Sequence, residues 1–160
     1  MQKSKMVIRC KDKSLIKGQS IDFLPAKRFF QLECLNGDVV TVDMLELKAI
    51  FFVKNFQGNE NHNYRYEDVI PWGNNKIEID FIDGETMIGY AQHYNCRKHH
   101  VYYSQYGFFV TPADFKGNNV RVFVMNSAVE RITFIHHIGH VSGYTQGKLI
   151  KSSTRNDSSI

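Results

Sequence analysis

Apolar and polar residues alternate along much of the first 54 positions, which is the pattern of half-buried β-strands. Met6, Ile8 and Cys10 form one such series, and the charged segment 11–14 then turns the chain. After this turn, the pattern predicts four further strands over residues 15–21, 29–34, 39–42 and 49–54.

A second series of strands follows in the same order after residue 76. It is predicted over residues 77–81, 86–92, 107–111, 120–124 and 131–136. The early elements of the two series correspond at a step of 83 − 12 = 71, and the late ones at 122 − 40 = 82. This pattern indicates an internal repeat whose second copy carries an insertion in its middle.

Local signals refine both copies. Asp83-Gly84 between apolar runs predicts a two-residue type I′ hairpin, because glycine accepts the positive φ that this turn needs. Asp12 occupies the matching turn, so we interpret both aspartates as turn residues rather than as an acid–base pair. Gly18 and Gly89, each six residues after the turn aspartate, predict a sharp bend in the strand that contains them.

The segment 43–50 is compatible with a helix, with Asp43 as its N-cap and Glu46 three residues later. Its counterpart, 125–132, contains Asn126 and Ser127, which favour a turn. Because one conformation has to serve both copies, we expect a single 3₁₀ turn followed by a strand.

These elements predict an all-β fold of two tandem five-stranded small barrels, related by the internal repeat and each closed so that no strand edge stays exposed. The expected boundaries are a first barrel at 1–56, a linker at 57–75, a second barrel at 76–138 with an inserted hairpin loop at 94–106, and a polar C-terminal tail at 139–160. Trp72 is expected to pack across the seam between the barrels, and residues 151–160 are expected to be mobile.

Composition limits the class of protein. The 160 residues carry a net charge of +4, which permits an anionic partner without requiring one. No apolar run reaches the roughly 20 residues of a membrane span, and the first residues lack the apolar region of a secretory signal. Cys10, Cys34 and Cys96 are an odd set with no CxxC pair, so we expect Cys10 and Cys34 to be buried free thiols and the compartment to be a reducing cytoplasm.

The strand–turn–strand opening with its internal glycine resembles the Sm-like and SH3-like small barrels. The segments 47–59, 107–114 and 118–124 also look like the signature of an uncharacterised bacterial domain family, over roughly residues 5–136. Some members of that family are attached to signalling domains, including the PilZ type. The resemblance implies a bacterial or phage origin and a non-catalytic accessory role. Asp43-Met44 and Met125-Asn126 stand where RNA-binding Sm proteins have Arg-Gly, so the Sm-type RNA site is not expected.

The insertion in the second copy is the main candidate for chemistry. Four consecutive basic residues precede three tyrosines, and cations interleaved with aromatic rings can hold phosphate and stack a base. The corresponding loop of the first copy is shorter but also basic, and two such loops would form one positive face. The candidate ligand-binding residues are Lys27, Arg28, Arg97, Lys98, His99, His100, Tyr102, Tyr103 and Tyr106. The alternative interpretation is a long solvated hairpin whose tyrosines cover the barrel.

A second arrangement has the residue types of a zinc site. It contains only one cysteine, however, and a long stretch of sequence separates its two pairs of residues. Its members are Cys96, His99, His136 and His140. In the alternative interpretation, His136 and His137 simply end the last strand. We therefore predict no metal and no cofactor.

No nucleophile elbow, P-loop or HExxH motif is present, so an enzyme is not predicted. The function we predict is non-catalytic binding of a phosphate-bearing ligand, a nucleotide or nucleic acid, through the basic aromatic loops. The alternative is a protein–protein adaptor in bacterial signalling, and homo-oligomerisation is compatible with either.

Overall fold

The computed structural model of the protein describes residues 3–58, 62–63, 76–91, 94–95, 100–101, 104–135, 141–145 and 148–153. In this part of the chain, twelve strands form one antiparallel sheet and two short strands form a separate pair. The fold is therefore all-β, as the alternating pattern predicted. Among the described residues, the regular structure outside the strands consists of two 3₁₀ turns.

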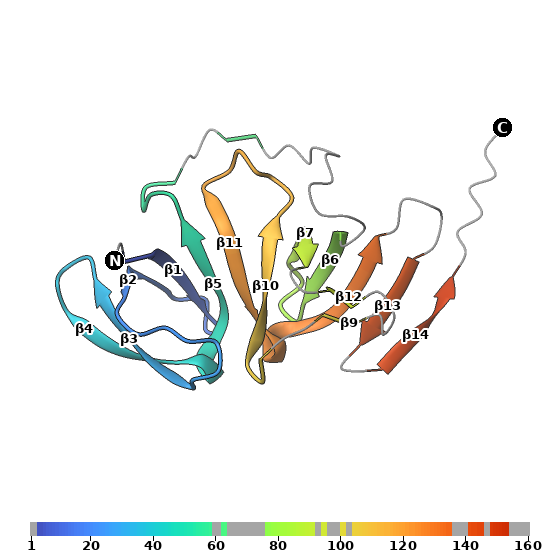
Figure 1. Ribbon diagram of the computed structural model, residues 1–160, viewed down its shortest axis with the longest axis horizontal. Coiled ribbons are helices and arrows are strands. Elements are labelled where there is room, and N and C mark those ends of the chain that lie inside the picture. Colours follow the sequence, from blue (N-terminus) through green and yellow to red (C-terminus); the bar gives the residue numbers. More distant parts are fainter. Residues whose placement is uncertain are drawn as a thin grey trace.

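The strands of the first half form a strongly curved part of the sheet (Figure 1). Its elements are β1 (Lys5–Cys10), β2 (Leu15–Ser20), β3 (Phe29–Cys34), β4 (Val39–Asp43), the 3₁₀ turn η1 (Met44–Glu46) and β5 (Leu47–Val53). In space they follow the order β4-β3-β2-β1-β5. Each predicted strand of this half is present, and the segment after Asp43 is the expected single 3₁₀ turn.

The second half has the same spatial order, β11-β10-β7-β6-β12. Its elements are β6 (Lys76–Phe81), β7 (Thr86–Ala91), β10 (Gly107–Pro112), β11 (Asn119–Met125), the 3₁₀ turn η2 (Asn126–Ala128) and β12 (Val129–Ile135). The registers also agree. Met6 pairs with Gly18 in the first half, and Ile77 pairs with Gly89 in the second.

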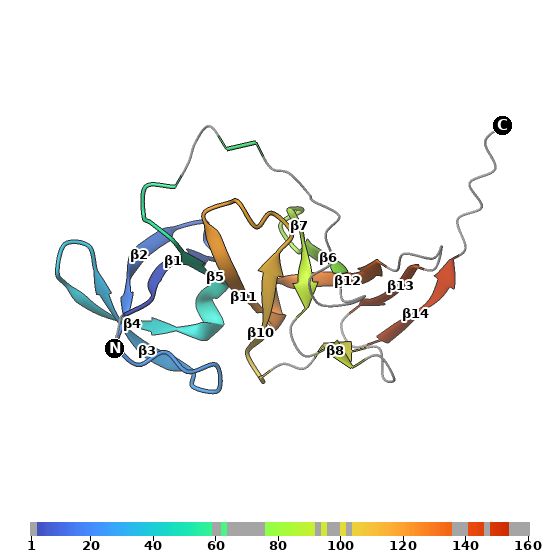
Figure 2. The same cartoon turned by 45° about the horizontal axis from the view of Figure 1, so that its top comes forward.

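The sheet is open, and this corrects the prediction of two closed barrels. The outer edge of β5 pairs with β11 of the second half, so the two halves form one continuous sheet (Figure 2). A strand has two edges, and β5 uses one for β1 and the other for β11. It therefore has no edge left to close the first half against β4, which remains at the end of the sheet.

Two strands extend the sheet beyond β12, in a segment where the pattern predicted only a polar tail. They are β13 (Val141–Thr145) and β14 (Lys148–Ser153), and β13 pairs antiparallel with β12. Within the insertion, β8 (Tyr94–Asn95) pairs with β9 (His100–Val101). Trp72, the rest of 64–75 and residues 154–160 lie outside the described residues, so the predictions made for them stay predictions.

The β6–β7 turn differs from the predicted type I′ turn. Gly84 has φ 86°, and Asp83 does not have the positive φ that a type I′ turn also requires. The Gly84 amide donates to the Phe81 carbonyl at 2.9 Å, and the Phe81 amide donates to the Glu85 carbonyl at 2.8 Å. This is a three-residue loop with the left-handed residue last. In the first half, Lys13 (φ 71°) takes the same position.

Gly18 and Gly89 lie where two strands approach too closely for a side chain. A Cβ atom at Gly18 would lie 2.3 Å from the Glu33 carbonyl oxygen. One at Gly89 would lie 2.5 Å from Cγ1 of Val110 and 2.6 Å from the Thr111 carbonyl oxygen. The glycines therefore let β3 and β10 fold tightly over β2 and β7, which agrees with the predicted bend.

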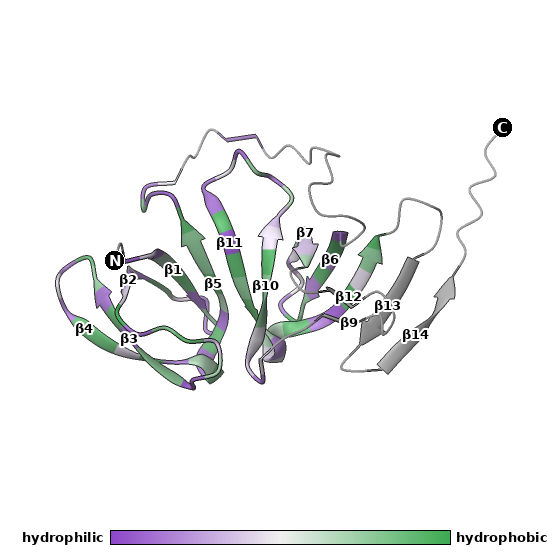
Figure 3. Ribbon diagram, viewed as in Figure 1, coloured by the Kyte–Doolittle hydropathy of each residue, from purple (hydrophilic) through white to green (hydrophobic). Residues whose placement is uncertain are grey.

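One apolar core runs through both halves. Ile8, Phe30 and Ile50 from the first half and Ile79 and Phe123 from the second are at most 1% exposed, and all belong to one cluster. Figure 3 shows β5 as a largely hydrophobic strand, consistent with its central place in the sheet. The seam between the halves is thus part of the core.

Candidate functional site

Arg121 on β11 is the cation with the most unusual surroundings in the described part of the chain. Its guanidinium carbon lies 4.4 Å from the centre of the Phe52 ring and 4.6 Å from that of Phe109. Both rings attract a cation through their negative faces. In addition, Arg121 and Phe52 are paired across the β5–β11 junction, so the backbone itself places the guanidinium over that ring.

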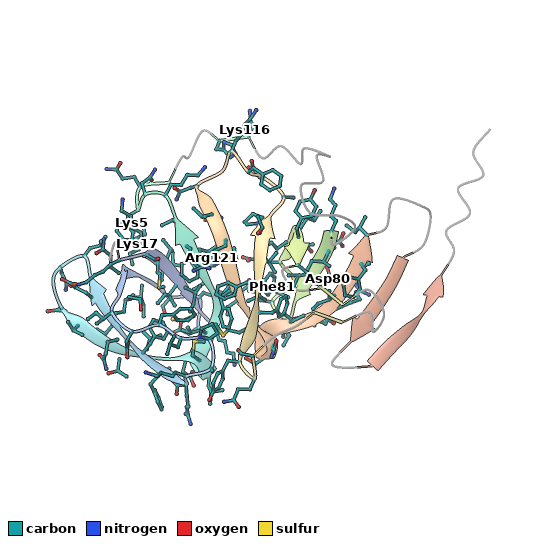
Figure 4. The ribbon with its side chains drawn as sticks, in the orientation of Figure 1. Lys5, Lys17, Asp80, Phe81, Lys116 and Arg121 are labelled. Carbon is teal, nitrogen blue, oxygen red and sulfur yellow. The ribbon has the colours of Figure 1, made fainter. Side chains whose placement is uncertain are left out.

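Three lysines line the same cavity as this guanidinium. Lys3, Lys5, Lys54 and Arg121 line a surface cavity of about 460 Å³ together with Phe52 and Val53. Figure 4 shows Lys5 and Arg121 on the part of the sheet formed by β1, β5 and β11. We call this cavity, defined by these six residues, the Arg121 groove.

The cations of the Arg121 groove are poorly neutralised. Lys3 pairs with Glu33 at 2.5 Å. Lys5 and Lys54 instead donate to main-chain carbonyls, of Lys54 at 3.2 Å and of Phe115 at 3.4 Å. Among the described residues, no carboxylate lies within ion-pair distance of Lys5, Lys54 or Arg121. The groove therefore carries more positive than negative charge.

Burial of the Arg121 side chain lowers the pKa of its guanidinium below its usual range. An arginine stays protonated at neutral pH even so. A half-buried cation without a carboxylate lacks the charge partner that would offset its lost hydration. An anion entering the groove would supply that partner, which makes the groove a candidate anion-binding site.

A second charged cluster lies at the seam between the halves, and here the charges are satisfied. Lys48 is buried, and its Nζ lies 2.5 Å from Oδ2 of Asp83 and 2.6 Å from Oε2 of Glu85. Arg9 donates to both oxygens of Glu85 at 2.7 and 2.8 Å. These four residues connect β1 and β5 to the β6–β7 turn. We call them the Lys48 cluster and assign it to holding the halves together.

The end of the insertion contacts the shorter loop of the first half in the part of the chain that the structure describes. The Ser104 hydroxyl donates to the Pro25 carbonyl at 2.8 Å, which brings the end of the insertion against the loop before β3. Tyr106 packs against the core. Lys27 is exposed.

Arg28, however, is already paired. Its Nε and Nη2 donate to the Asp43 carboxylate at 3.1 and 2.9 Å, and this contact raises the pKa of the guanidinium. The same contact lowers the pKa of Asp43. Arg28 therefore has less positive charge to offer an anion than Arg121 has.

The rest of the predicted site stays a prediction. Arg97, Lys98, His99, Tyr102 and Tyr103 lie outside the described residues, and His100 is described only through the backbone of β9. All four members of the zinc arrangement, Cys96, His99, His136 and His140, also lie outside them. Among the side chains that the structure describes, no group of three His, Cys, Asp or Glu residues could hold a metal ion.

Sequence reasoning missed Arg121 because its signal is small. The residue interrupts an apolar run, Val120-Arg121-Val122-Phe123-Val124, whose pattern predicts only a strand of the second barrel. A cation within an apolar strand is a reason to look for an aromatic or anionic partner. The lysines of the groove come from residues 3–5 and 54, so only the fold brings them to Arg121.

The fold is all-β, and its described part has a cationic groove at the junction of the two halves. The chain belongs to a family of unknown function, DUF6982, whose model matches residues 2–136. This confirms the resemblance to an uncharacterised family. No curated protein and no solved structure matches the chain. In the described part of the chain there is no helix with the length and apolar character to cross a membrane.

Proposed function

We propose that the protein is a non-catalytic binding module for a phosphate-bearing ligand, a nucleotide or nucleic acid, held in the Arg121 groove. The observation that carries the proposal is the Arg121 guanidinium, which is positioned on two aromatic rings and has no carboxylate partner among the described residues. Guanidinium groups bind phosphate oxygens in a two-point geometry, and lysines add positive charge around them.

We also infer that the two halves are copies of one five-stranded unit of the Sm-like and SH3-like type. The shared strand order, the paired registers and the two 3₁₀ turns support this inference. A bacterial or phage source is part of the same inference, as the family resemblance implies. The cytoplasm is the proposed compartment. Cys10 and Cys34 are free thiols, which is consistent with it, although they are half-buried rather than buried as predicted.

Titration of the full chain against mono-, di- and cyclic nucleotides and short single-stranded RNA and DNA tests the proposal. Arg121→Gln is expected to weaken binding by about tenfold or more, and Lys54→Gln by less, because a lysine contributes a point charge without the two-point geometry. If Arg121 contacts a phosphate of an oligonucleotide, its loss should lower the slope of log K against log salt by about one.

Arg131→Gln is the matched control. Arg131 is an exposed arginine that is already paired with Asp80 at 2.8 Å, so its loss should leave affinity unchanged. The pair Arg97→Ala and Lys98→Ala tests the insertion separately. Binding that depends on the insertion but not on Arg121 would move the site to the loops. The proposal would be refuted if every ligand of the panel bound with a dissociation constant in the millimolar range or weaker.

The alternative function, a protein–protein adaptor, has one observation in its favour. Apolar side chains around the free end of the sheet are exposed, namely Phe29, Leu35, Val39 and Leu45, at 50%, 61%, 57% and 41%. Exposed apolar residues that cluster on one surface are typical of an interaction site. Salt dependence separates the two functions, because phosphate binding weakens steeply with salt and an apolar interface does not.

A further inference from the structure

The junction between β5 and β11 joins the halves by antiparallel strand pairing. Arg121 pairs with Phe52, Val122 with Phe51, and Phe123 with Ile50. Just beyond the strands, the Lys54 amide donates to the Asn118 carbonyl at 2.9 Å. Within the molecule, therefore, the fourth strand of the second half, β11, already pairs with the fifth strand of the first half, β5.

Each strand of this junction has a counterpart elsewhere in the sheet. Val42 of β4 pairs with Phe30 as Val124 of β11 pairs with Phe108, so β4 corresponds to β11. By the same comparison, β12 corresponds to β5, since Ile77 pairs with Phe134 as Met6 pairs with Phe52. The outer edges of β4 and β12 are therefore equivalent to the two edges that already pair within the molecule.

These two edges differ in what covers them. In the described sheet, β4 is a terminal strand without a neighbour on its outer side. The edge of β12 is covered by β13, with Thr133 opposite Gly143 and Phe134 opposite Ser142. The family match ends at residue 136, so the β13–β14 hairpin lies outside the unit that defines the family. The left and right ends of the sheet in Figure 1 show this contrast.

We propose that the edge of β4 is a docking edge for β12 of a second copy of this chain, and that the β13–β14 hairpin is a built-in cap that occupies β12 in its place. A terminal strand offers unpaired main-chain groups, which makes it a template for strand addition. The internal junction gives the register. Val39 would pair with Phe134 of the partner copy, Val40 with Thr133 and Thr41 with Ile132.

The occupant follows from continuity with the internal junction. The strand that β11 accepts is β5, and β12 is the other strand of this chain in the equivalent place. Val39, which is 57% exposed on β4, would be covered by this pairing. Because the cap is part of the same chain, its effective concentration exceeds that of a second copy, so the full chain is expected to stay monomeric.

Analytical ultracentrifugation and native mass spectrometry from about 1 to 100 µM would test the proposal. The full chain should remain a monomer across this range. A chain shortened after Ile138, which retains the whole family-matched unit, should increase in weight-average mass by twofold or more. In the shortened chain, Val39→Lys with Thr41→Lys should restore the monomer, because it places two cations opposite apolar residues of β12. Ile82→Lys, an equally exposed apolar site on the β6–β7 turn, is the matched control and should leave the oligomer intact.

Circular dichroism checks that the shortened chain folds. If it does not, the full chain with Gly143→Pro and Tyr144→Pro serves instead, since successive amides point to opposite sides of a strand and one of these two faces β12. A folded, uncapped chain that stays monomeric at 100 µM would overturn the proposal. Oligomers of the shortened chain that persist with both Val39→Lys and Thr41→Lys would overturn it too. A full chain that oligomerises through β4 would show that the hairpin is not a cap and would also overturn it.

Discussion

Replacement of Lys48 by methionine tests how the two halves are held together. Lys48 is only 7% exposed at its side chain and contacts Asp83 and Glu85 at once. Its Nζ also lies 4.5 Å from the centre of the Phe81 ring. Methionine keeps an unbranched chain over that ring and removes only the charge.

The stability that Lys48→Met should remove depends on how exposed the carboxylates of Asp83 and Glu85 are. Removing one partner of a fully buried ion pair costs about 3–5 kcal/mol, whereas an exposed pair is worth about 0–1 kcal/mol. The side chains of Asp83 and Glu85 are 33% and 48% exposed, and Glu85 keeps its contact with Arg9. We therefore expect a loss of about 2 kcal/mol at neutral pH, which lowers Tm by about 4–8 °C in a chain of this size.

The loss should depend on pH. A hydrogen bond from Lys48 lowers the pKa of Asp83 below its ordinary value of 3.8, and contacts from Arg9 and then Lys48 lower the pKa of Glu85 below 4.5. A lowered pKa in the folded state contributes stability above the unfolded value, and this contribution disappears as pH falls through the folded value. The difference between wild type and Lys48→Met should therefore shrink as pH falls below about 4.5.

Urea unfolding of wild type and Lys48→Met at pH 7 and at pH 3 measures both the loss of stability and its dependence on pH. Lys11→Met is the control, because the Lys11 side chain is exposed and its ammonium group donates to the Leu45 carbonyl rather than to a carboxylate; its effect should stay within about 0.5 kcal/mol. An equal loss for Lys48→Met at both pH values would mean that packing rather than charge is responsible. No loss at pH 7 would refute the role of the Lys48 cluster altogether.

Three further predictions concern turns, bends and metal. Gly89→Val should lower stability by about 3 kcal/mol or more, because its Cβ would lie 2.5 Å from Cγ1 of Val110; an unchanged Tm would contradict the bend. Lys13→Gly should raise the free energy of unfolding by up to about 1 kcal/mol, because the positive φ of Lys13 costs a non-glycine residue more; a decrease would argue against strain at this turn. Elemental analysis after purification with added zinc should find none, and one equivalent per chain would instead support the set Cys96, His99, His136 and His140.

Predictions of local structure from the sequence succeeded where a short segment decides the outcome. The ten predicted strands and both 3₁₀ turns are present. The close approach at Gly18 and Gly89 was visible as a glycine at the same place in both series. The loop predicted at Asp83-Gly84 was one residue too short. A single positive-φ glycine fits the three-residue loop as well as the two-residue one, so the sequence does not distinguish them.

Neither the open sheet nor the Arg121 groove could be predicted in this way. Whether β5 closes against β4 or extends to β11 depends on which strand reaches its free edge, and the residues of β5 are apolar in either case. Arg121 and Lys5 are 116 positions apart (121 − 5 = 116), and only the β1–β5–β11 pairing brings them to one groove.

The sequence by itself determined the all-β class, the positions of the strands, the order of turns and the glycines at the bends, since these depend on residues close together in the chain. The tertiary structure alone decided that two curled halves share one open sheet and that Lys48 is buried against Asp83 and Glu85. It also decided that Arg121 lies on aromatic rings, with no carboxylate at ion-pair distance in the described part of the chain. The physical reason is that the partners of a strand edge or of a charge can lie far away in the sequence and become neighbours only in the folded chain. In addition, a strand edge can pair with any strand that has a compatible backbone.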